Sequence, residues 1–268
     1  MPQALHERRH SACANNVSTS TLPKHRHLAP TPRQSPIDIR TNDLCHDPKE
    51  CKADSLNIDC KSGDCSDLIC TSTGFRVNPG RNCKSTFSSS YLKDVYEFAQ
   101  FHAHWGQDAS CGSEHTIDGK KYAAEVHFVF YNTKYGSFAE AAEKDDGLAV
   151  IGVLLEKGDH NPNYEVLIDT VKKGIGNDKP VPMPKGYSWE GLLPTSNKRD
   201  FVTYLGSLTT PPYLESVTWT VFLTPVNISD QQLSILRKIT PANYRSCQDV
   251  CGRTVRCSKG GSNSNVYL

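Results

Sequence analysis

The chain has 268 residues, and its 30 Lys and Arg residues balance 29 Asp and Glu residues, which leaves a formal net charge of +1. Such a weak overall field gives no electrostatic basis for binding nucleic acid or an acidic lipid surface, so we expect neither as a partner. No apolar run approaches the ~20 residues that span a bilayer, and all-β domains of this length are often single. We therefore expect one soluble domain with a deep core.

The predicted elements begin with a polar arm over residues 1–33, which contains several prolines and few apolar residues. The arm starts with a stretch rich in His and Arg that lacks the apolar segment of a secretory signal. From Gln34 onward the pattern changes, and we expect a single domain over residues 34–256. The remaining residues, 257–268, are rich in Gly, Ser and Asn and are predicted to form a flexible tail.

Cysteine is abundant, with eleven residues in the chain and a cysteine-rich segment over residues 45–83. Five of these cysteines lie in one polar stretch, at positions 45, 51, 60, 65 and 70. This density is typical of disulfide bonding in an oxidising compartment, and the spacing lacks the Cys-x2-Cys ends of a zinc knuckle. We therefore expect a secreted protein whose signal peptide is not present in this form. The odd number of cysteines allows a disulfide-linked oligomer, and the triplets at Asn16 and Asn227 agree with N-glycosylation.

Short runs that mix β-branched and aromatic residues, separated by turn residues, predict the strands of a mostly antiparallel sheet. These runs are Tyr96–Phe101, Val126–Tyr131, Leu148–Leu155 and Val217–Leu223. Weaker patterns predict short helices at Phe138–Glu143, Tyr164–Lys173 and Asp230–Ile239, and the last of these has a one-sided apolar face. The predicted fold class is therefore mainly β with short helices, built as a single domain.

Two of the predicted strands carry histidines at the period of two that places side chains on one face. Gln100, His102 and His104 share a face of the first strand, and Glu125 and His127 share a face of the second. If the two strands are neighbours, three imidazoles meet at one point. Three neutral nitrogens and a water make the open tetrahedral arrangement of a catalytic zinc site. Imidazole also binds copper, iron and nickel, so the residues alone leave the metal open.

A single histidine on a strand is more often a hydrogen-bonded structural residue than a metal ligand, so the neighbouring residues matter. Gln100 and Glu125 each precede a candidate ligand by two residues, on the same face. From there a side-chain oxygen can accept a hydrogen bond from the second ring nitrogen and fix the tautomer of the ligand. This arrangement favours a metal site over a purely structural one.

Five sequence segments resemble the successive motifs of alpha-class carbonic anhydrases, in the order of that family and at compatible intervals. The segments are QSPIDI (34–39), FHAHWG (101–106), GSEHTIDGKKYAAEVHFVFYN (112–132), DGLAVIGVLLEKG (146–158) and YLGSLTTPPYLESVTW (204–219). NYRSCQDVCGR (243–253) resembles a degraded form of the closing motif. The resemblance implies bound Zn²⁺, a central twisted and mostly antiparallel sheet, and a conical active-site cleft that ends at the metal.

Position by position, the resemblance implies that His102, His104 and His127 are the zinc ligands. It gives their second ring nitrogens the partners Gln100, Glu125 and the backbone carbonyl of Asn243, and it makes His115 a structural neighbour of Glu114. Thr209 and Glu114 are the implied catalytic pair, in which Thr209 accepts a hydrogen bond from zinc-bound hydroxide and donates one to Glu114. The implied substrate pocket comprises Val129, Val150, Leu208, Thr210, Val217 and Trp219. The Pro211–Pro212 peptide is expected to be cis.

The resemblance implies the reversible hydration of CO2 to bicarbonate and a proton, so the expected partner is this small-molecule substrate. One alternative is a disulfide-stapled, carbonic-anhydrase-like binding or matrix protein with little catalysis, but such relatives typically lose a zinc ligand and none is lost here. Another alternative is an enzyme whose main substrate is a different small carbonyl compound or an ester.

Several features depart from the family pattern, and two of them concern the proton shuttle and the cysteines. Thr73 stands at the position where fast members carry a proton-shuttling histidine, and threonine does not ionise near neutral pH. His25, His27 and His46 are other candidates for a shuttle, although nothing in their spacing ties them to the cleft. The cysteine pair of secreted relatives is also absent, since Tyr213 occupies one of its positions.

Overall fold

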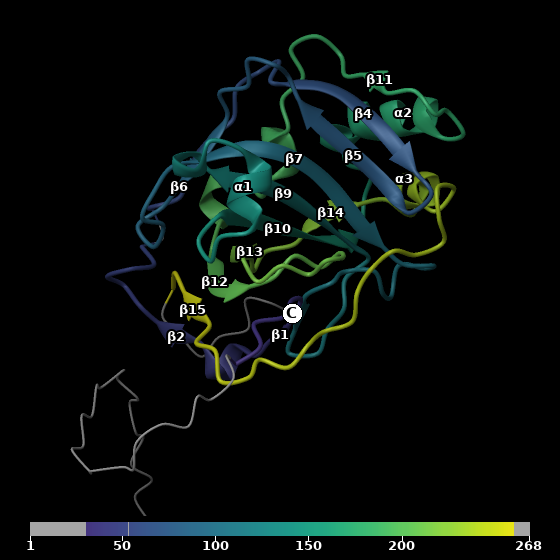
Figure 1. Cartoon of the computed structure of the whole chain (residues 1–268). Coiled ribbons are helices and arrows are strands. Elements are labelled where there is room, and N and C mark those ends of the chain that lie inside the picture. Colours follow the sequence, from purple (N-terminus) through teal and green to yellow (C-terminus); the bar gives the residue numbers. More distant parts are fainter. Residues whose placement is uncertain (1–30, 53, 260–268) are drawn as a thin grey trace, which may run out of the picture. The chain divides into compact units, whose positions relative to one another are not determined.

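A computed structural model describes residues 31–52 and 54–259 of the chain (Figure 1). Most of the predicted N-terminal arm, with Asn16, His25 and His27, therefore lies outside the described residues, and so does the tail from residue 260. The predicted boundary after residue 256 is too early, because Arg256–Cys257 forms the strand β15. This strand pairs with two others in the main sheet, so the domain continues beyond the predicted boundary.

The main sheet has 13 strands, and most of them form one continuous hydrogen-bonded series (Figure 1). In spatial order the series is β11 (Val181–Pro182), β4 (Cys65–Thr71), β5 (Gly74–Pro79), β7 (Tyr96–Trp105), β9 (Ala124–Asn132), β10 (Leu148–Lys157), β13 (Val217–Phe222), β12 (Phe201–Gly206), β15 and β2 (Cys45–His46). Three further strands join at its sides: β14 (Val226–Ile228) pairs with β10, and β3 (Asn57–Asp59) pairs with β6 (Thr86–Ser88), which also pairs with β7. A separate two-stranded sheet joins β1 (Asp38–Ile39) to β8 (Thr116–Ile117).

Most strand pairs in the main sheet are antiparallel, which confirms the predicted fold class. The exceptions are the parallel pairs of β10 with β13, β10 with β14, and β15 with β2. Because antiparallel neighbours are joined by short turns, strands that follow one another in the chain, such as β4 and β5, lie side by side.

The helices are few and short. The three α-helices are α1 (Phe138–Ala142), α2 (Glu165–Gly174) and α3 (Asp230–Leu236). Single 3-10 turns are η1 (Thr41–Asp43), η2 (Thr133–Tyr135), η3 (Pro162–Tyr164), η4 (Glu190–Leu192) and η5 (Ser196–Lys198). All three predicted helices are present, although α3 ends before the predicted Ile239. Ser229 and Gln232 form a reciprocal capping box that fixes the start of α3. No helix in the described ranges combines the length and apolar character of a membrane span.

The two faces of the central strands bury different side chains. On β9, Val126, Phe128 and Phe130 pack into one hydrophobic cluster with Trp189, while Val129 belongs to a second cluster with Trp219. This alternation is the period of two that was predicted from the sequence. It leaves the side chains of Glu125 and His127 on the same face as Val129, so the sheet separates the aromatic core from the face that carries the histidines.

Strand β7 contains a β-bulge at Ala99. The register with β9 shifts between Phe98 and Gln100, so one residue of β7 has no opposite partner. Tyr96 and Phe98 before the bulge belong to the same hydrophobic cluster as Phe101 after it. The cleft face of β7 therefore begins at Gln100, and the side chains of His102 and His104 follow it on that face.

The cysteine-rich segment is part of the main sheet and not a separate stapled module. It forms β4 and β5, which pair with each other, and β5 pairs with β7. Cys51 and Cys65 are buried in the aromatic cluster, and Cys60, Cys70 and Cys83 pack against it. Apart from Cys45, the described cysteines carry free thiols. The predicted disulfides therefore find no support in this structure.

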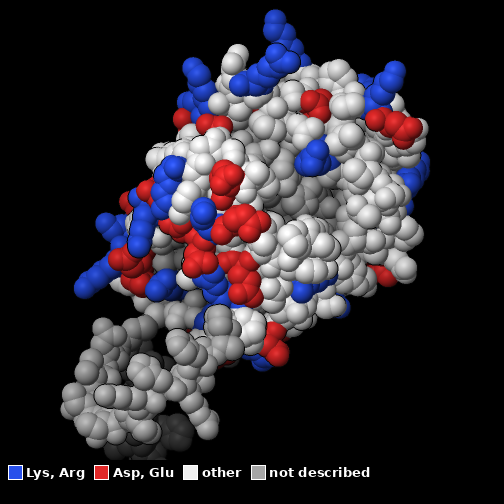
Figure 2. Space-filling model, viewed as in Figure 1, with Lys and Arg blue, Asp and Glu red and all other residues white. Residues whose placement is uncertain are grey.

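Charged residues are distributed as the composition predicts. On the face shown in Figure 2, Lys and Arg side chains are intermixed with Asp and Glu side chains, and no continuous field of one sign covers it. A hollow near the centre of this view is walled mainly by uncharged residues.

Candidate metal centre

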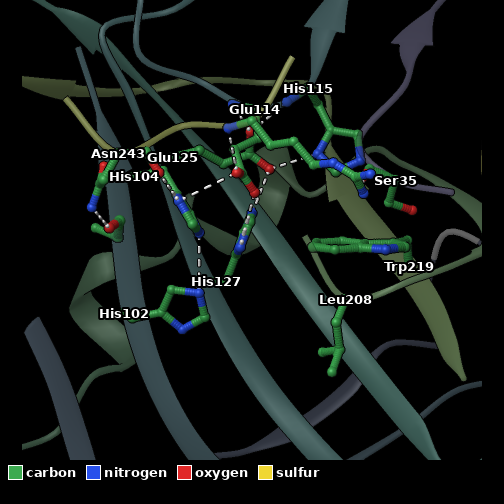
Figure 3. Close-up of polar contacts among 12 residues, drawn as sticks. Ser35, His102, His104, Glu114, His115, Glu125, His127, Leu208, Trp219 and Asn243 are labelled. Carbon is green, nitrogen blue, oxygen red and sulfur yellow. Dashed lines mark hydrogen bonds and ion pairs between the residues drawn. The ribbon is translucent and has the colours of Figure 1, made fainter. Parts of the chain in front are cut away.

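The pairing of β7 with β9 brings the three candidate ligands together. His102 lies opposite His127 in the antiparallel register, and His104 lies opposite Glu125. The backbone hydrogen bonds of two neighbouring strands thus set the positions of the three imidazoles, which converge from one face of the sheet (Figure 3).

The inward-facing nitrogens of the three rings lie within 4.8 Å of one another. The closest pair is His102 Nε2 and His104 Nε2, which are 3.1 Å apart. Each remaining ring nitrogen faces an oxygen: His102 Nδ1 faces Gln100 Oε1 at 2.9 Å, His104 Nδ1 faces the Asn243 carbonyl at 2.9 Å, and His127 Nε2 faces Glu125 Oε1 at 2.8 Å. The structure therefore brings together the three candidate ligands and the oxygen partners predicted for them.

This arrangement fits a cation. Because the other nitrogens donate to oxygen acceptors, Nε2 of His102 and Nε2 of His104 both present lone pairs across a gap of 3.1 Å with no proton to share. Burial lowers the pKa of all three imidazoles, so the rings are neutral at neutral pH and keep their lone pairs. Three converging lone pairs with no bound proton form a donor set for a divalent metal, and a neutral imidazole set of this kind suits zinc.

Glu125 is the most heavily hydrogen-bonded acceptor of the site. Its Oε2 accepts the backbone N–H groups of Glu114 and His115 at 2.9 and 2.8 Å, and its Oε1 faces His115 Nδ1 at 2.7 Å as well as His127. Burial opposes ionisation, but the neighbouring His115 and His127 with their hydrogen bonds hold the pKa of Glu125 well below its usual value. Glu125 is thus a buried carboxylate that fixes the orientation of His127.

His115, Glu125 and His127 also form a close cluster, but it is a hydrogen-bonded network and not a second metal site. The nitrogen of His127 in this cluster is the one already committed to Glu125. The other nitrogen of His115 lies 2.6 Å from the Tyr204 hydroxyl, which donates to Ser35 Oγ at 2.9 Å. Tyr204 and Ser35 were not among the predicted site residues, although both lie in segments that resemble the family motifs. Nothing in their spacing indicates that they meet.

Glu114 is buried next to the metal-facing side of the cluster. The Arg245 N–H donates to Glu114 Oε1 at 2.8 Å, while Glu114 Oε2 makes no hydrogen bond of standard geometry to the described residues. Burial raises the pKa of Glu114 to about 7. The buried Thr209 lies close enough to lower that pKa, as expected for the implied pair.

Asn243 has a larger role than the predicted carbonyl contact. Its Oδ1 accepts the Trp105 N–H at 2.8 Å, and its Nδ2 donates to the Thr73 carbonyl at 2.9 Å and to the Ala103 carbonyl at 3.2 Å. Asn243 therefore fastens the turn between β4 and β5 to the strand that carries His104. Thr73 is exposed in this turn, and Asn243 connects it to His104. The position that lacks a histidine is therefore one residue removed from a candidate ligand.

The predicted apolar wall is assembled on β9, β10 and β13. Val150 lies opposite Val129 on one side and opposite Trp219 on the other. These residues are buried in one cluster with Val217, and Leu208 packs against it. The Trp219 ring contacts the His127 ring edge to face at a centroid distance of 4.8 Å, and its Nε1 donates to the Ser207 carbonyl. An apolar surface therefore lies directly beside one ligand (Figure 3).

Two of the remaining predicted features, the Pro211–Pro212 peptide and Thr210, lie in the loop after β12, and His46 lies on β2. The Pro211–Pro212 peptide is cis, as expected. Thr210 is exposed, and its carbonyl accepts the Tyr213 N–H at 2.9 Å. The shuttle candidate His46 is exposed on β2, which ends the strand series on the opposite side from β4 and β5. His46 is therefore remote from His102 in the order of the sheet.

The sequence model of eukaryotic-type carbonic anhydrases matches residues 19–259, which is most of the chain. The chain therefore belongs to the eukaryotic-type carbonic anhydrase family. With its cluster of three histidines, the protein is a zinc-dependent enzyme that hydrates CO2 reversibly to bicarbonate and a proton.

Proposed function

We propose that His102, His104 and His127 hold the zinc ion of this carbonic anhydrase. The observation that carries the proposal is the 3.1 Å approach of His102 Nε2 to His104 Nε2, while the Nδ1 atom of each ring faces an oxygen acceptor. When bound by three neutral ligands, zinc lowers the pKa of a coordinated water to about 7 and so supplies a nucleophile at neutral pH.

Glu114 and Thr209 orient the reacting oxygen in this proposal. Glu114 Oε2 is buried without a hydrogen-bond partner among the described residues, so it requires a donor. The Thr209 hydroxyl is the group nearby that can supply one, since Thr209 already lowers the pKa of Glu114. Once its proton is committed to Glu114, Thr209 can only accept a hydrogen bond from the nucleophile. This fixes which lone pair of the nucleophile points toward the substrate.

The apolar wall positions CO2. Val129, Val150, Val217 and Trp219 are each at most 2% exposed, and the polar atom of Trp219 is occupied by the Ser207 carbonyl. The wall therefore offers no hydrogen bond to a substrate and favours a small neutral molecule beside His127. With Leu208 at its edge, it can hold CO2 next to the metal centre without polar contact. Thr210, which is exposed, is assigned to the mouth of the same pocket.

The test combines two measurements on one sample, metal content by mass spectrometry and CO2 hydration by stopped flow. We expect one zinc per chain, loss of hydration on chelation, and recovery when zinc is returned. Full zinc content with no hydration would favour the binding or matrix protein. Ester hydrolysis faster than CO2 hydration would favour the alternative substrate class.

We also propose that the protein is secreted, disulfide-bonded and N-glycosylated. The support is the density of cysteines between residues 45 and 70 and the exposure of Asn227 in its glycosylation triplet. Burial and, after it, the nearby thiols of Cys60 and Cys83 raise the pKa of Cys65, so these three thiols are neighbours at the start of β4.

This second proposal is tested on protein made through a secretory route. Its intact mass should increase by two hydrogen atoms for each disulfide on reduction. Treatment with a peptide N-glycosidase should remove mass from the natural chain, and it should remove less mass from Asn227→Gln. A disulfide-linked oligomer should dissociate on reduction. Recovery of every cysteine as a free thiol would overturn the assignment of compartment.

A further inference from the structure

A cavity of about 480 Å³ lies beside the metal centre. It is formed by the end of β5 and the loop after it, the bulged part of β7, and the segment from β9 into α1. Gln100 lines the cavity and also holds His102, so one side chain connects the cavity to the metal centre. Its volume is typical of a small-molecule site.

Arg76 gives this cavity an unpaired positive charge. It lies directly opposite His102 in the register of β5 with β7, and it is exposed toward the cavity that it lines. Its Nε donates to Asn78 Oδ1 at 2.8 Å, which holds the guanidinium in place. The terminal nitrogens of Arg76 have no hydrogen bond or ion pair to any residue of the described ranges.

Two further donors line the same cavity. Arg81 is exposed and has no hydrogen bond or ion pair with the described part of the chain. The Gln100 oxygen faces His102, which leaves the amide N–H groups of Gln100 without an acceptor there. The carboxylate that lines the cavity, Glu97, accepts the Tyr131 hydroxyl at 2.8 Å and pairs with neither arginine. Two guanidinium groups against one carboxylate leave the cavity with a positive charge.

We propose that this cavity is an anion site in which Arg76, with Gln100 and Arg81, binds the bicarbonate product next to the metal centre. The planar fork of a guanidinium matches the two oxygens of a carboxylate or carbonate group, and such charge-assisted bonds are stronger than neutral ones. CO2 is neutral and gains nothing from this charge. The site therefore separates the anionic product from the apolar wall that holds the neutral substrate. The product assignment rests on the proposed function, but the anion site itself does not.

The first experiment uses metal-free protein, so that its outcome does not depend on catalysis. The binding of ¹³C-bicarbonate is measured from the broadening of its NMR line by the natural chain, Arg76→Gln and Arg81→Gln. A unit charge at about 4 Å contributes about 1 kcal/mol in water, so we expect Kd to rise about fivefold in Arg76→Gln. Arg256→Gln on β15, which removes an exposed arginine that pairs with Asp47 and does not line the cavity, is the control and should bind as the natural chain does. Thermal unfolding verifies that each variant is folded.

The second experiment uses zinc-loaded protein in the dehydration direction, where KM for bicarbonate should rise by a similar factor in Arg76→Gln and stay constant in Arg256→Gln. Benzoate is titrated in parallel, since Tyr131 also lines the cavity and an aromatic carboxylate shares the chemistry. Equal bicarbonate binding by the natural chain and Arg76→Gln would overturn the anion site. Benzoate binding more than tenfold tighter than bicarbonate would overturn the assignment to the product.

Discussion

Each of the three histidines is held by a different kind of acceptor. His102 faces a side-chain amide, His104 faces a backbone carbonyl and His127 faces a carboxylate. Since an anionic acceptor makes the imidazole more basic than a neutral acceptor does, His127 is the strongest electron donor of the set. The partners of the ligands, and not the ligands alone, thus determine the electronic character of the site.

His104→Ala should abolish both tight zinc binding and CO2 hydration. The variant leaves two imidazoles where a catalytic zinc site has three, and it leaves the Asn243 carbonyl without its donor. Zinc content after dialysis and stopped-flow hydration are the measurements, and His46→Ala serves as the control because His46 is exposed on β2. Natural rates in a zinc-free His104→Ala sample would refute the assignment of the ligands.

Thr209→Ala should retain zinc and lose roughly 100-fold in kcat, since one preorganised catalytic hydrogen bond contributes ~3 kcal/mol. The reason is that Glu114 then loses the hydroxyl that lowers its pKa, and the nucleophile loses the acceptor that orients it. Thr195→Ala, an exposed threonine outside the site, is the matched control. Turnover within twofold of the natural chain would show that Thr209 does not orient the reaction.

Thr73→His should raise turnover in weak buffer. The exposed turn that contains Thr73 is joined to His104 through Asn243, so an imidazole at this position lies near the site and can carry a proton to solvent. In the natural chain, kcat should increase with the concentration of an imidazole buffer while kcat/KM for CO2 stays constant. High turnover that ignores buffer concentration would reveal another internal shuttle.

At the scale of elements, the strands β9, β10 and β13 could be predicted, and the strands β4 and β5 could not. β9, β10 and β13 mix β-branched and aromatic residues, and β9 buries both of its faces in distinct surroundings, so their patterns are strong. β4 and β5 carry cysteines, Asp67 and Asn78 among fewer apolar residues, which led to the expectation of a stapled loop. Their place is fixed by pairing with β7, which is a long-range contact that local sequence does not encode.

The candidate site shows the same division. Gln100, Glu125 and the three ligands follow from the period of two, because each partner precedes its ligand on the same strand. The contacts of the Asn243 side chain and the Tyr204–Ser35 pair join segments more than a hundred residues apart. Such contacts depend on the order of strands in the sheet and cannot be deduced from spacing.

Asp64 stabilises the cysteine-rich segment, and Asp64→Asn should reduce the free energy of unfolding by about 2 kcal/mol. Its Oδ2 accepts the N–H groups of Lys84 and Ser85 at 2.6 and 2.7 Å and the Ser85 hydroxyl at 2.9 Å. Burial opposes ionisation, but these hydrogen bonds outweigh it and lower the pKa of Asp64.

The effect of Asp64 should depend on pH in a defined direction. Because the folded pKa lies below the ordinary value of 3.8, the stabilisation is complete above that value and is lost as pH falls through the folded pKa. Urea unfolding at several pH values should give a constant difference in the free energy of unfolding between the natural chain and Asp64→Asn, of roughly 2 kcal/mol, from pH 5 to pH 8. The difference should be smaller below pH 4. Asp54→Asn, an exposed carboxylate, is the control. A difference that grows in acid would contradict this sign.

For the whole molecule, removal of zinc should lower Tm without unfolding the sheet. The ligands lie on β7 and β9 inside the main sheet, and oxygen acceptors orient their rings without the metal. A ligand present at 1,000 times its Kd stabilises by about 4 kcal/mol, which corresponds to roughly 10 °C for a domain of this size. Circular dichroism and thermal unfolding of chelated protein are the measurements. Loss of β structure at 25 °C on chelation would show that zinc, and not the sheet, organises the site.

The bulge at Ala99 determines which alternate residues of β7 face the core and which face the metal centre. Before it, even-numbered residues of β7 (Tyr96 and Phe98) enter the aromatic cluster, and after it odd-numbered residues (Phe101, Ala103 and Trp105) do. A β7 without the extra residue could keep the histidines in the cleft only by turning Tyr96 and Phe98 out of the aromatic cluster. Deleting Ala99 would therefore change the face of the sheet that the side chains on one side of the deletion occupy. The loss of one small residue outside the site would turn either the histidines or the aromatic core residues to the wrong face.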